Sequence, residues 1–97
     1  MFTGTLTLDL LLGDVRSLKQ KRSVVRPIVA ELRRRFEVSV AEVGNADLYR
    51  RAEIGLAVVS ANAAHCRAVL EAAERLVADR PEIELLSARH ALHSDSD

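Results

Sequence analysis

Five basic residues in the first third of the chain have the type and spacing of a phosphate-binding surface. They are Arg16, Lys19, Lys21, Arg22 and Arg26. Residues 16–35 contain eight of the fourteen basic side chains and one acid, Glu31, although the whole chain has a formal net charge of zero. Such a local excess suits an anionic partner, most directly a phosphate backbone. The alternative is a solvated helix face that keeps a small protein in solution.

A second candidate set lies in the segment 47–51. Tyr49 has the ring to stack on a nucleobase, and Arg50 and Arg51 have the charge to contact phosphate. One aromatic is too few for a stacking platform of the usual kind. We therefore favour a structural interpretation, in which Tyr49 covers an open edge of the core and Asp47 closes the loop through Asx-type hydrogen bonds.

Three carboxylates near this loop, Glu42, Asp47 and Glu53, are the only basis for an enzyme hypothesis. Acid–base catalysis needs carboxylates at a defined separation with shifted pKa values, and the sequence indicates neither. We expect Glu42 and Glu53 to pair with Arg50 or Arg51 as surface salt bridges. No phosphate-binding glycine loop, nucleophile elbow or zinc-protease motif occurs, so we predict no catalytic residue and no cofactor.

The other potential ligands and nucleophiles favour structural roles. Cys66 is the one cysteine, which excludes an internal disulfide, and it falls on an apolar helix stripe, so we expect it in the core. His65 beside it points about 100° away and cannot form a nucleophile–base pair with it. His90 and His93 have no pre-formed ligand set with the acids of the tail, so we predict no metal site.

The basic residues must be positioned by a helix. Residues 2–12 alternate apolar and polar side chains, as a half-buried strand does. Ser17 and Gln20 form a capping box, which predicts a helix from Leu18. Its apolar stripe consists of Leu18, Val25, Ile28, Val29, Leu32 and Phe36. Beside that stripe, within an arc of about 60°, fall Lys19, Arg22, Arg26 and Arg33.

The remaining elements predict an α+β fold. We expect strands over 38–43, 54–59 and 83–92, the last with a bulge at Leu85–Leu86, and a second helix that Asn62 caps and Arg80–Pro81 ends. The order β-α-β-β-α-β predicts the ferredoxin-like arrangement, a four-stranded antiparallel sheet with two helices on one face. Residues 1–92 form one domain, and the polar tail 93–97 is predicted to be disordered.

Alternation along the strands also predicts the open face of the sheet. Its members are Thr3, Thr5, Thr7, Asp9, Ser39, Ala41, Val43, Gly55, Ala57 and Val59. Ferredoxin-like RNA readers place two or three aromatics on this face, and none of the three aromatics in this chain can lie there. We interpret this smooth surface either as a solvent face or as the interface of a homodimer.

Three stretches together resemble a known family: S-L-K-Q-K-R at 17–22, V-S-V-A-E-V at 38–43 and D-L-Y-R-R-A-E-I-G at 47–55. They are similar to the YlxP-like proteins, a bacterial family of unassigned function with a ferredoxin-like fold, and the resemblance spans residues 1 to about 92. Genes of this family commonly lie beside those for translation initiation factor 2 and ribosome-binding factor A. The resemblance thus implies, by association, a role near ribosome maturation or translation initiation.

Together these patterns predict a non-catalytic RNA- or ribosome-associated protein that docks on phosphates through the basic helix. Its expected partner is ribosomal RNA or the small ribosomal subunit. The alternative is a homodimeric regulatory or protein-interaction module that pairs through the open sheet face. No apolar run is long enough to span a membrane, and the N-terminus lacks signal-peptide features, so we expect a cytoplasmic protein with no membrane partner.

Overall fold

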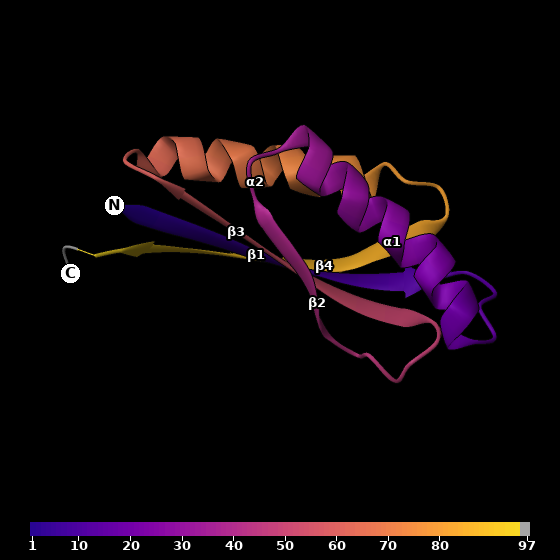
Figure 1. Cartoon of the computed structure of the whole chain (residues 1–97). Coiled ribbons are helices and arrows are strands. Elements are labelled where there is room, and N and C mark those ends of the chain that lie inside the picture. Colours follow the sequence, from indigo (N-terminus) through magenta and orange to yellow (C-terminus); the bar gives the residue numbers. More distant parts are fainter. Residues whose placement is uncertain (96–97) are drawn as a thin grey trace.

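A computed structural model describes residues 1–95 of the 97-residue chain, and it has the predicted ferredoxin-like order. Every strand pair in the sheet is antiparallel, and the spatial order is β2-β3-β1-β4. Both helices lie on the same face of the sheet, while the opposite face is open (Figure 1). The elements are β1 (Phe2–Leu12), α1 (Leu18–Arg35), β2 (Ser39–Gly44), β3 (Arg51–Ser60), α2 (Ala63–Ala78) and β4 (Ile83–Ser94).

Both helices begin at the predicted caps. The Ser17 side chain accepts a hydrogen bond from the Gln20 amide (3.1 Å), and the Gln20 side chain accepts one from the Arg16 amide (2.6 Å). Asn62 caps α2 by accepting from the His65 amide at 3.1 Å. These bonds satisfy backbone donors that a helix end otherwise leaves without partners. The first cap fixes where α1 starts and therefore which side its basic residues occupy.

The core lies between the sheet and the helices and is almost entirely aliphatic. Alternate residues of β1 are fully buried, and their neighbours on the same strand face the open side. The largest buried side chains include Leu6, Leu8, Leu10, Leu12, Ile28, Leu32, Ile54, Leu70 and Val77. Cys66 is also fully buried, as predicted, with its Sγ 3.8 Å from the carbonyl oxygen of Phe2.

Arg80, which follows α2, links the C-terminal end of that helix to the C-terminal part of α1. Its guanidinium donates to Glu31 of α1 (2.8 Å) and to Glu82 just before β4 (2.6 Å). The hydrogen bond from Arg80 lowers the pKa of the Glu82 carboxyl, and the hydrogen bond to Glu82 raises the pKa of Arg80. One cation of the second half thus serves the fold, and Glu31, the single acid of α1, has a partner outside its own helix.

The last strand is longer than the sequence predicts. β4 continues through His93 and Ser94, because β1 starts at Phe2 and its first residues pair with these two. Asp95 then accepts a hydrogen bond at 2.9 Å from the N-terminal ammonium, which lowers the pKa of that carboxyl. The prediction of a disordered tail from residue 93 is therefore wrong for 93–94, and residues 96–97 lie outside the described part.

Leu86 forms the predicted bulge. Asp9 pairs with Ser87 and Leu10 with Leu85, which leaves Leu86 as the extra residue of β4. The bulge keeps Ile83 and Leu85 on the core side while Ser87 and Arg89 return to the open side. Across the described residues, neither helix combines the length and apolar character that crossing a membrane requires.

Gly4 is required where α2 approaches β1. A Cβ at this position would lie 2.9 Å from Leu70 Cδ1 and 3.2 Å from Cys66 Cβ, both on α2. We predict that Gly4→Val destabilises the protein by about 1–3 kcal/mol, because the core has no room for three more carbons. Gly13 has open space around it, so Gly13→Val should change stability by less than about 0.5 kcal/mol. Urea unfolding of both variants provides the test, and equal midpoints would contradict the close approach.

Candidate nucleic-acid interface

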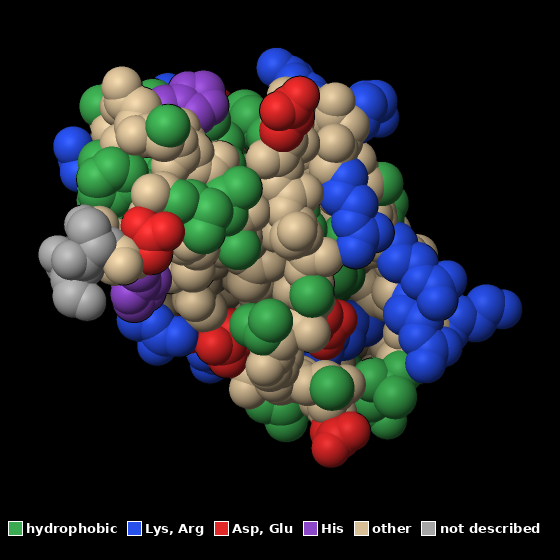
Figure 2. Space-filling view, turned by 60° about the vertical axis from the view of Figure 1, so that its left-hand side comes forward, with side chains coloured by type: hydrophobic (Ala, Val, Ile, Leu, Met, Phe, Trp, Pro, Cys, Tyr) green, Lys and Arg blue, Asp and Glu red, His purple; other side chains and the backbone are tan. Residues whose placement is uncertain are grey.

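The first half of α1 exposes three cations that the fold does not use. Lys19, Arg22 and Arg26 are all exposed, and none forms an ion pair or hydrogen bond with another side chain among residues 1–95. Helical geometry places them on one side, with a rise of about 10 Å from Lys19 to Arg26. Figure 2 shows Lys and Arg side chains gathered along its right-hand edge, where α1 runs. Of the four cations predicted on this face, these three are exposed and free, whereas Arg33 donates to the Val40 carbonyl oxygen at 2.7 Å.

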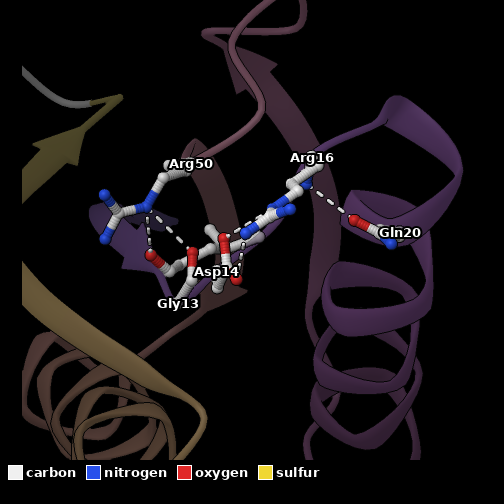
Figure 3. Close-up of polar contacts among 6 residues, drawn as sticks. Gly13, Asp14, Arg16, Gln20 and Arg50 are labelled. Carbon is white, nitrogen blue, oxygen red and sulfur yellow. Dashed lines mark hydrogen bonds and ion pairs between the residues drawn. The ribbon is translucent and has the colours of Figure 1, made fainter.

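Arg16 adjoins this face at the start of α1. Its side chain is 80% exposed and holds the Asp14 carboxylate through two hydrogen bonds of 3.2 Å (Figure 3). An exposed ion pair of this kind contributes little to stability. Asp14 orients Arg16 and partly neutralises it, so Arg16 is a weaker phosphate ligand than the three cations of α1.

Arg50 is held rigidly at the same end of the sheet. Its Nε donates to the carbonyl oxygens of Leu12 (3.2 Å) and Gly13 (2.9 Å), while its two terminal nitrogens point away from that loop (Figure 3). The fixed side chain loses little rotamer freedom on binding, and its free end keeps four N–H donors for an anion. Arg50 is therefore positioned as an anion ligand, although the sequence suggested a salt bridge to Glu42 or Glu53.

Arg51 is engaged by another residue of the sheet, whereas Tyr49 is not. Arg51 donates to Asp9 of the neighbouring strand at 3.2 Å, which removes it from the set of free cations. Tyr49 is 47% exposed and has no hydrogen bond with another described residue, so its ring remains accessible. The structure brings Arg16 and Arg50 near the first turn of α1 but engages Arg51 in the sheet.

Lys21 is not part of the exposed surface, contrary to the sequence-based prediction. Its side chain is 3% exposed, and Nζ contacts Glu42 Oε1 at 3.0 Å and the carbonyl oxygen of Asn45 at 2.8 Å. The reason is its place on the helix: it lies four residues before Val25 and seven before Ile28, on the buried stripe. A buried ammonium needs such partners to offset its desolvation.

The carboxylates of the loop region have partners other than those predicted. Glu42 pairs with Lys21 of α1, and Glu53 pairs with Arg89 of β4 at 3.2 Å. Asp47 is exposed and forms no Asx turn, since the loop is closed by the Leu48 amide donating to the Asn45 carbonyl (3.1 Å). The prediction that Glu42 and Glu53 bind Arg50 or Arg51 is wrong, because both carboxylates have nearer cations on other elements.

A hollow of about 390 Å³ opens beside the free cations. It lies between α1 and the loop after β2, and its volume falls in the range of small-molecule sites. Leu18, Val25 and Ala46 supply apolar lining, the Lys21–Glu42 pair supplies polar lining, and Arg22 and Arg26 complete it. No pattern in the sequence predicts this hollow, because its two sides are about twenty residues apart in the chain.

The open face of the sheet has the predicted members. The register pairs Thr5 with Ala57 and Thr7 with Gly55, and β2 adds Ser39 and Ala41 beside them. Val43 and Val59 are the most exposed apolar side chains there, at 57% and 62%. Toward the loop end the face carries two cross-strand ion pairs, Arg51–Asp9 and Arg89–Glu53.

Among residues 1–95, no group of three or more His, Cys, Asp or Glu side chains is arranged to hold a metal ion. His90 Nε2 instead lies 2.6 Å from Glu74 Oε1. Asp97, which the sequence grouped with His93, lies outside the described residues.

Comparison with known proteins gives a family and a fold. A family model described as "Protein of unknown function (DUF503)" matches residues 3–90. The chain is 32% identical over 76 residues to the "Uncharacterized protein YlxP" of Bacillus subtilis (strain 168), covering 78% of this chain and 83% of that protein. The resemblance to the YlxP-like proteins inferred from the sequence is thus confirmed.

Among solved structures, the chain is similar to a de novo designed protein with a ferredoxin fold, with a TM-score of 0.57 and 10% identity. That match covers all of this chain and 89% of the designed one. The chain is also matched, at a TM-score of 0.48 and 15% identity, to SnoaB, a cofactor-independent oxygenase from Streptomyces nogalater, over 98% of this chain and 94% of that one. The similarity to the designed protein supports the ferredoxin-like fold and says nothing about chemistry.

The buried position of Lys21 leads to a test against its exposed neighbour on the same helix. We predict that Lys21→Ala lowers the free energy of unfolding by about 2 kcal/mol or more, because it removes buried methylenes and leaves Glu42 without its cation. Lys19→Ala is the matched control and should change stability by less than about 0.5 kcal/mol. Urea unfolding measures both, and a neutral Lys21→Ala would contradict a structural role for the pair.

Proposed function

The chain belongs to the DUF503 family, whose description names no activity, and we propose that it is an RNA-binding protein that docks on phosphates through the basic face of α1. The proposal involves no catalytic step. The small ribosomal subunit as the partner follows only from the family resemblance, and the phosphate chemistry follows from the residues themselves.

The observation that supports this function is the lack of partners for Lys19, Arg22 and Arg26. Cations in the first turns of a helix oppose its dipole, and no acid stands in the first turn of α1 to offset them. Lys19, in the first turn, therefore gains no stabilisation from the helix dipole. Several other cations hold carboxylates or backbone carbonyls, as Lys21, Arg33, Arg50, Arg51 and Arg80 do. Arg67 and Arg75 of α2 also lack a side-chain partner among the described residues, but no third free cation joins them on that helix. Free cations on one side of a net-neutral protein are best explained by an anionic partner.

The geometry favours contact with a phosphate backbone over a single small anion. The free cations extend along the helix, and Arg50 adds a fixed guanidinium fork beyond the first turn. Contacts of this kind position a protein on nucleic acid and carry little sequence information. Their strength should fall as salt rises, since each phosphate contact releases counterions.

Reversing two charges on α1 tests the proposal. We predict that Lys19→Glu with Arg22→Glu weakens binding to single-stranded RNA by about tenfold or more and lowers the slope of log affinity against log salt by about 1–2. The same variant should no longer cosediment with the small ribosomal subunit at low salt. Fluorescence anisotropy over a salt series measures the first effect, and gradient sedimentation the second.

The matched control is Arg67→Glu with Arg75→Glu, which makes the same charge change on exposed positions of α2. It should bind RNA nearly as well as the natural protein. If both double variants lost affinity equally, the effect would come from net charge alone and the role of α1 would be refuted.

A second candidate function is a homodimeric interaction module that pairs through the open sheet face. It is favoured by the exposure of Val43 and Val59 and by the balanced charges at the loop end, where two acids and two bases make the face self-complementary. A two-fold axis would bring like surfaces together without a net charge cost.

The dimer hypothesis has its own test at the centre of that face. We predict that Ala57→Glu abolishes self-association, because an unpaired carboxylate would be buried between two sheets. Ala64→Glu on the exposed side of α2 is the control and should leave association unchanged. Sedimentation equilibrium from about 1 to 100 μM is the measurement, a span that detects micromolar dissociation constants. A monomeric natural protein throughout this span would exclude the dimer.

A further inference from the structure

We propose that the hollow beside α1 receives one unstacked nucleobase that carries an amino group, and that Glu42 accepts a hydrogen bond from that group. This inference deepens the proposed function and rests on it. The ligand would then be a single-stranded RNA segment with adenine, cytosine or guanine at one position. RNA without an amino-bearing base at that position would bind more weakly.

The shape and lining of the hollow suit a base. Its volume is about 390 Å³, and its apolar lining comes from Leu18 and Val25 of α1 and Ala46 of the facing loop. Arg22 and Arg26 also line it, and a guanidinium plane stacks well on an aromatic ring. The same two arginines lie on the free cationic face, so the phosphates that flank a bound base would meet cations at the entrance.

The Glu42 carboxylate disfavours a phosphate on its side of the hollow, although Lys21, Arg22 and Arg26 make the lining as a whole positive. Glu42 and Lys21 neutralise each other there at 3.0 Å, and a phosphate would have to approach the carboxylate. A base is neutral and has both an apolar ring and polar edges, which match this lining. The hollow and the cationic face therefore take different parts of the same strand.

Glu42 is the group that selects among bases. Its Oε1 is engaged by Lys21, and its side chain is 32% exposed, so the carboxylate keeps acceptor capacity for a ligand. A carboxylate accepts from the amino groups of cytosine, adenine or guanine. Uracil has no amino group, and its ring N–H is flanked by two carbonyl oxygens that repel a carboxylate. The site should therefore reject uracil.

The facing side of the hollow is held in place before any ligand binds. Asn45 has a positive φ of 59°, a conformation that asparagine tolerates better than most residues, and its carbonyl accepts from Lys21 Nζ and from the Leu48 amide. Ala46 follows directly, so its position depends on the same contacts. A pre-formed wall reduces the ordering cost of binding.

The test uses short uridine oligomers that carry one central test position: uracil, cytosine, adenine, guanine or an abasic site. We expect the natural protein to bind the oligomers with an amino-bearing base about fivefold or more tightly than the uracil and abasic ones, as one good base contact provides. Fluorescence anisotropy at fixed low salt gives the affinities.

Two variants test the role of the hollow in binding, and a third variant is the control. Ala46→Leu fills the hollow from an exposed loop position and should reduce all oligomers to the affinity of the abasic one, and Ala61→Leu, in the exposed turn before α2, should not. Glu42→Gln keeps the shape of the side chain but adds an amide group that can donate to a uracil carbonyl. The difference in affinity between the amino-bearing and the uracil oligomers should therefore become smaller.

The outcomes distinguish the two proposals. Salt-dependent binding that is lost in the Lys19→Glu, Arg22→Glu variant but is equal for all five oligomers would overturn the base site and leave the phosphate interface standing. The same holds if Ala46→Leu leaves every affinity unchanged. Absence of binding to every oligomer at low salt would overturn both proposals.

Discussion

The Lys21–Glu42 ion pair is the contact on which the site depends. Lys21 belongs to the buried stripe of α1, and Glu42 belongs to the edge strand β2. The Asn45 carbonyl, which also accepts a hydrogen bond from Lys21, belongs to the loop after β2. One ammonium thus joins a helix, a strand and a loop. It fixes the distance between the cationic helix and the loop that faces it. Without this contact the loop side of the hollow would lose a tie to α1, and the Glu42 carboxylate would be left without its cation.

Partner assignment, more than charge count, decides which basic residues are available for function. Arg33 donates to the Val40 carbonyl, Arg50 to the loop after β1, and Arg80 to two carboxylates. Each of these bonds joins different elements or an element to a loop, so each contributes to the fold. Lys19, Arg22 and Arg26 have no such partner and lie together on α1, beside the hollow, whereas the unpartnered Arg67 and Arg75 lie on α2. A chain with equal numbers of acids and bases thereby has a positively charged surface on one helix.

The fold could be predicted because its signals are local. Strict alternation in β1, the Ser17 and Asn62 caps and the slip at Leu85–Leu86 each depend on a few neighbouring residues. The end of β4 could not, because residues 93–94 are ordered by pairing with β1 at the opposite end of the chain. In the candidate site, helical spacing predicted the shared face of Lys19, Arg22 and Arg26, but it could not predict that Arg33 beside them donates to the Val40 carbonyl. The burial of Lys21 could also have been predicted, since Lys21 lies on the same helix stripe as Val25 and Ile28. Its charge led instead to the prediction that it is exposed. The partners of Glu42 and Glu53, and the hollow itself, depend on strand register and helix placement, which composition and periodicity do not determine.

Under the proposed function a carboxylate lies beside a phosphate-binding surface, and the burial of Lys21 supplies a physical reason for it. An acid at the position of Glu42 weakens the attraction of nearby cations for a polyanion, so a surface optimised only for phosphate would carry a neutral residue there. Lys21 removes most of that penalty by neutralising the carboxylate from the buried side. The exposed side of Glu42 still accepts hydrogen bonds, a property that a neutral apolar residue would lack. The pair would therefore cost the proposed interface little charge while it leaves an exposed acceptor for the amino group of a base.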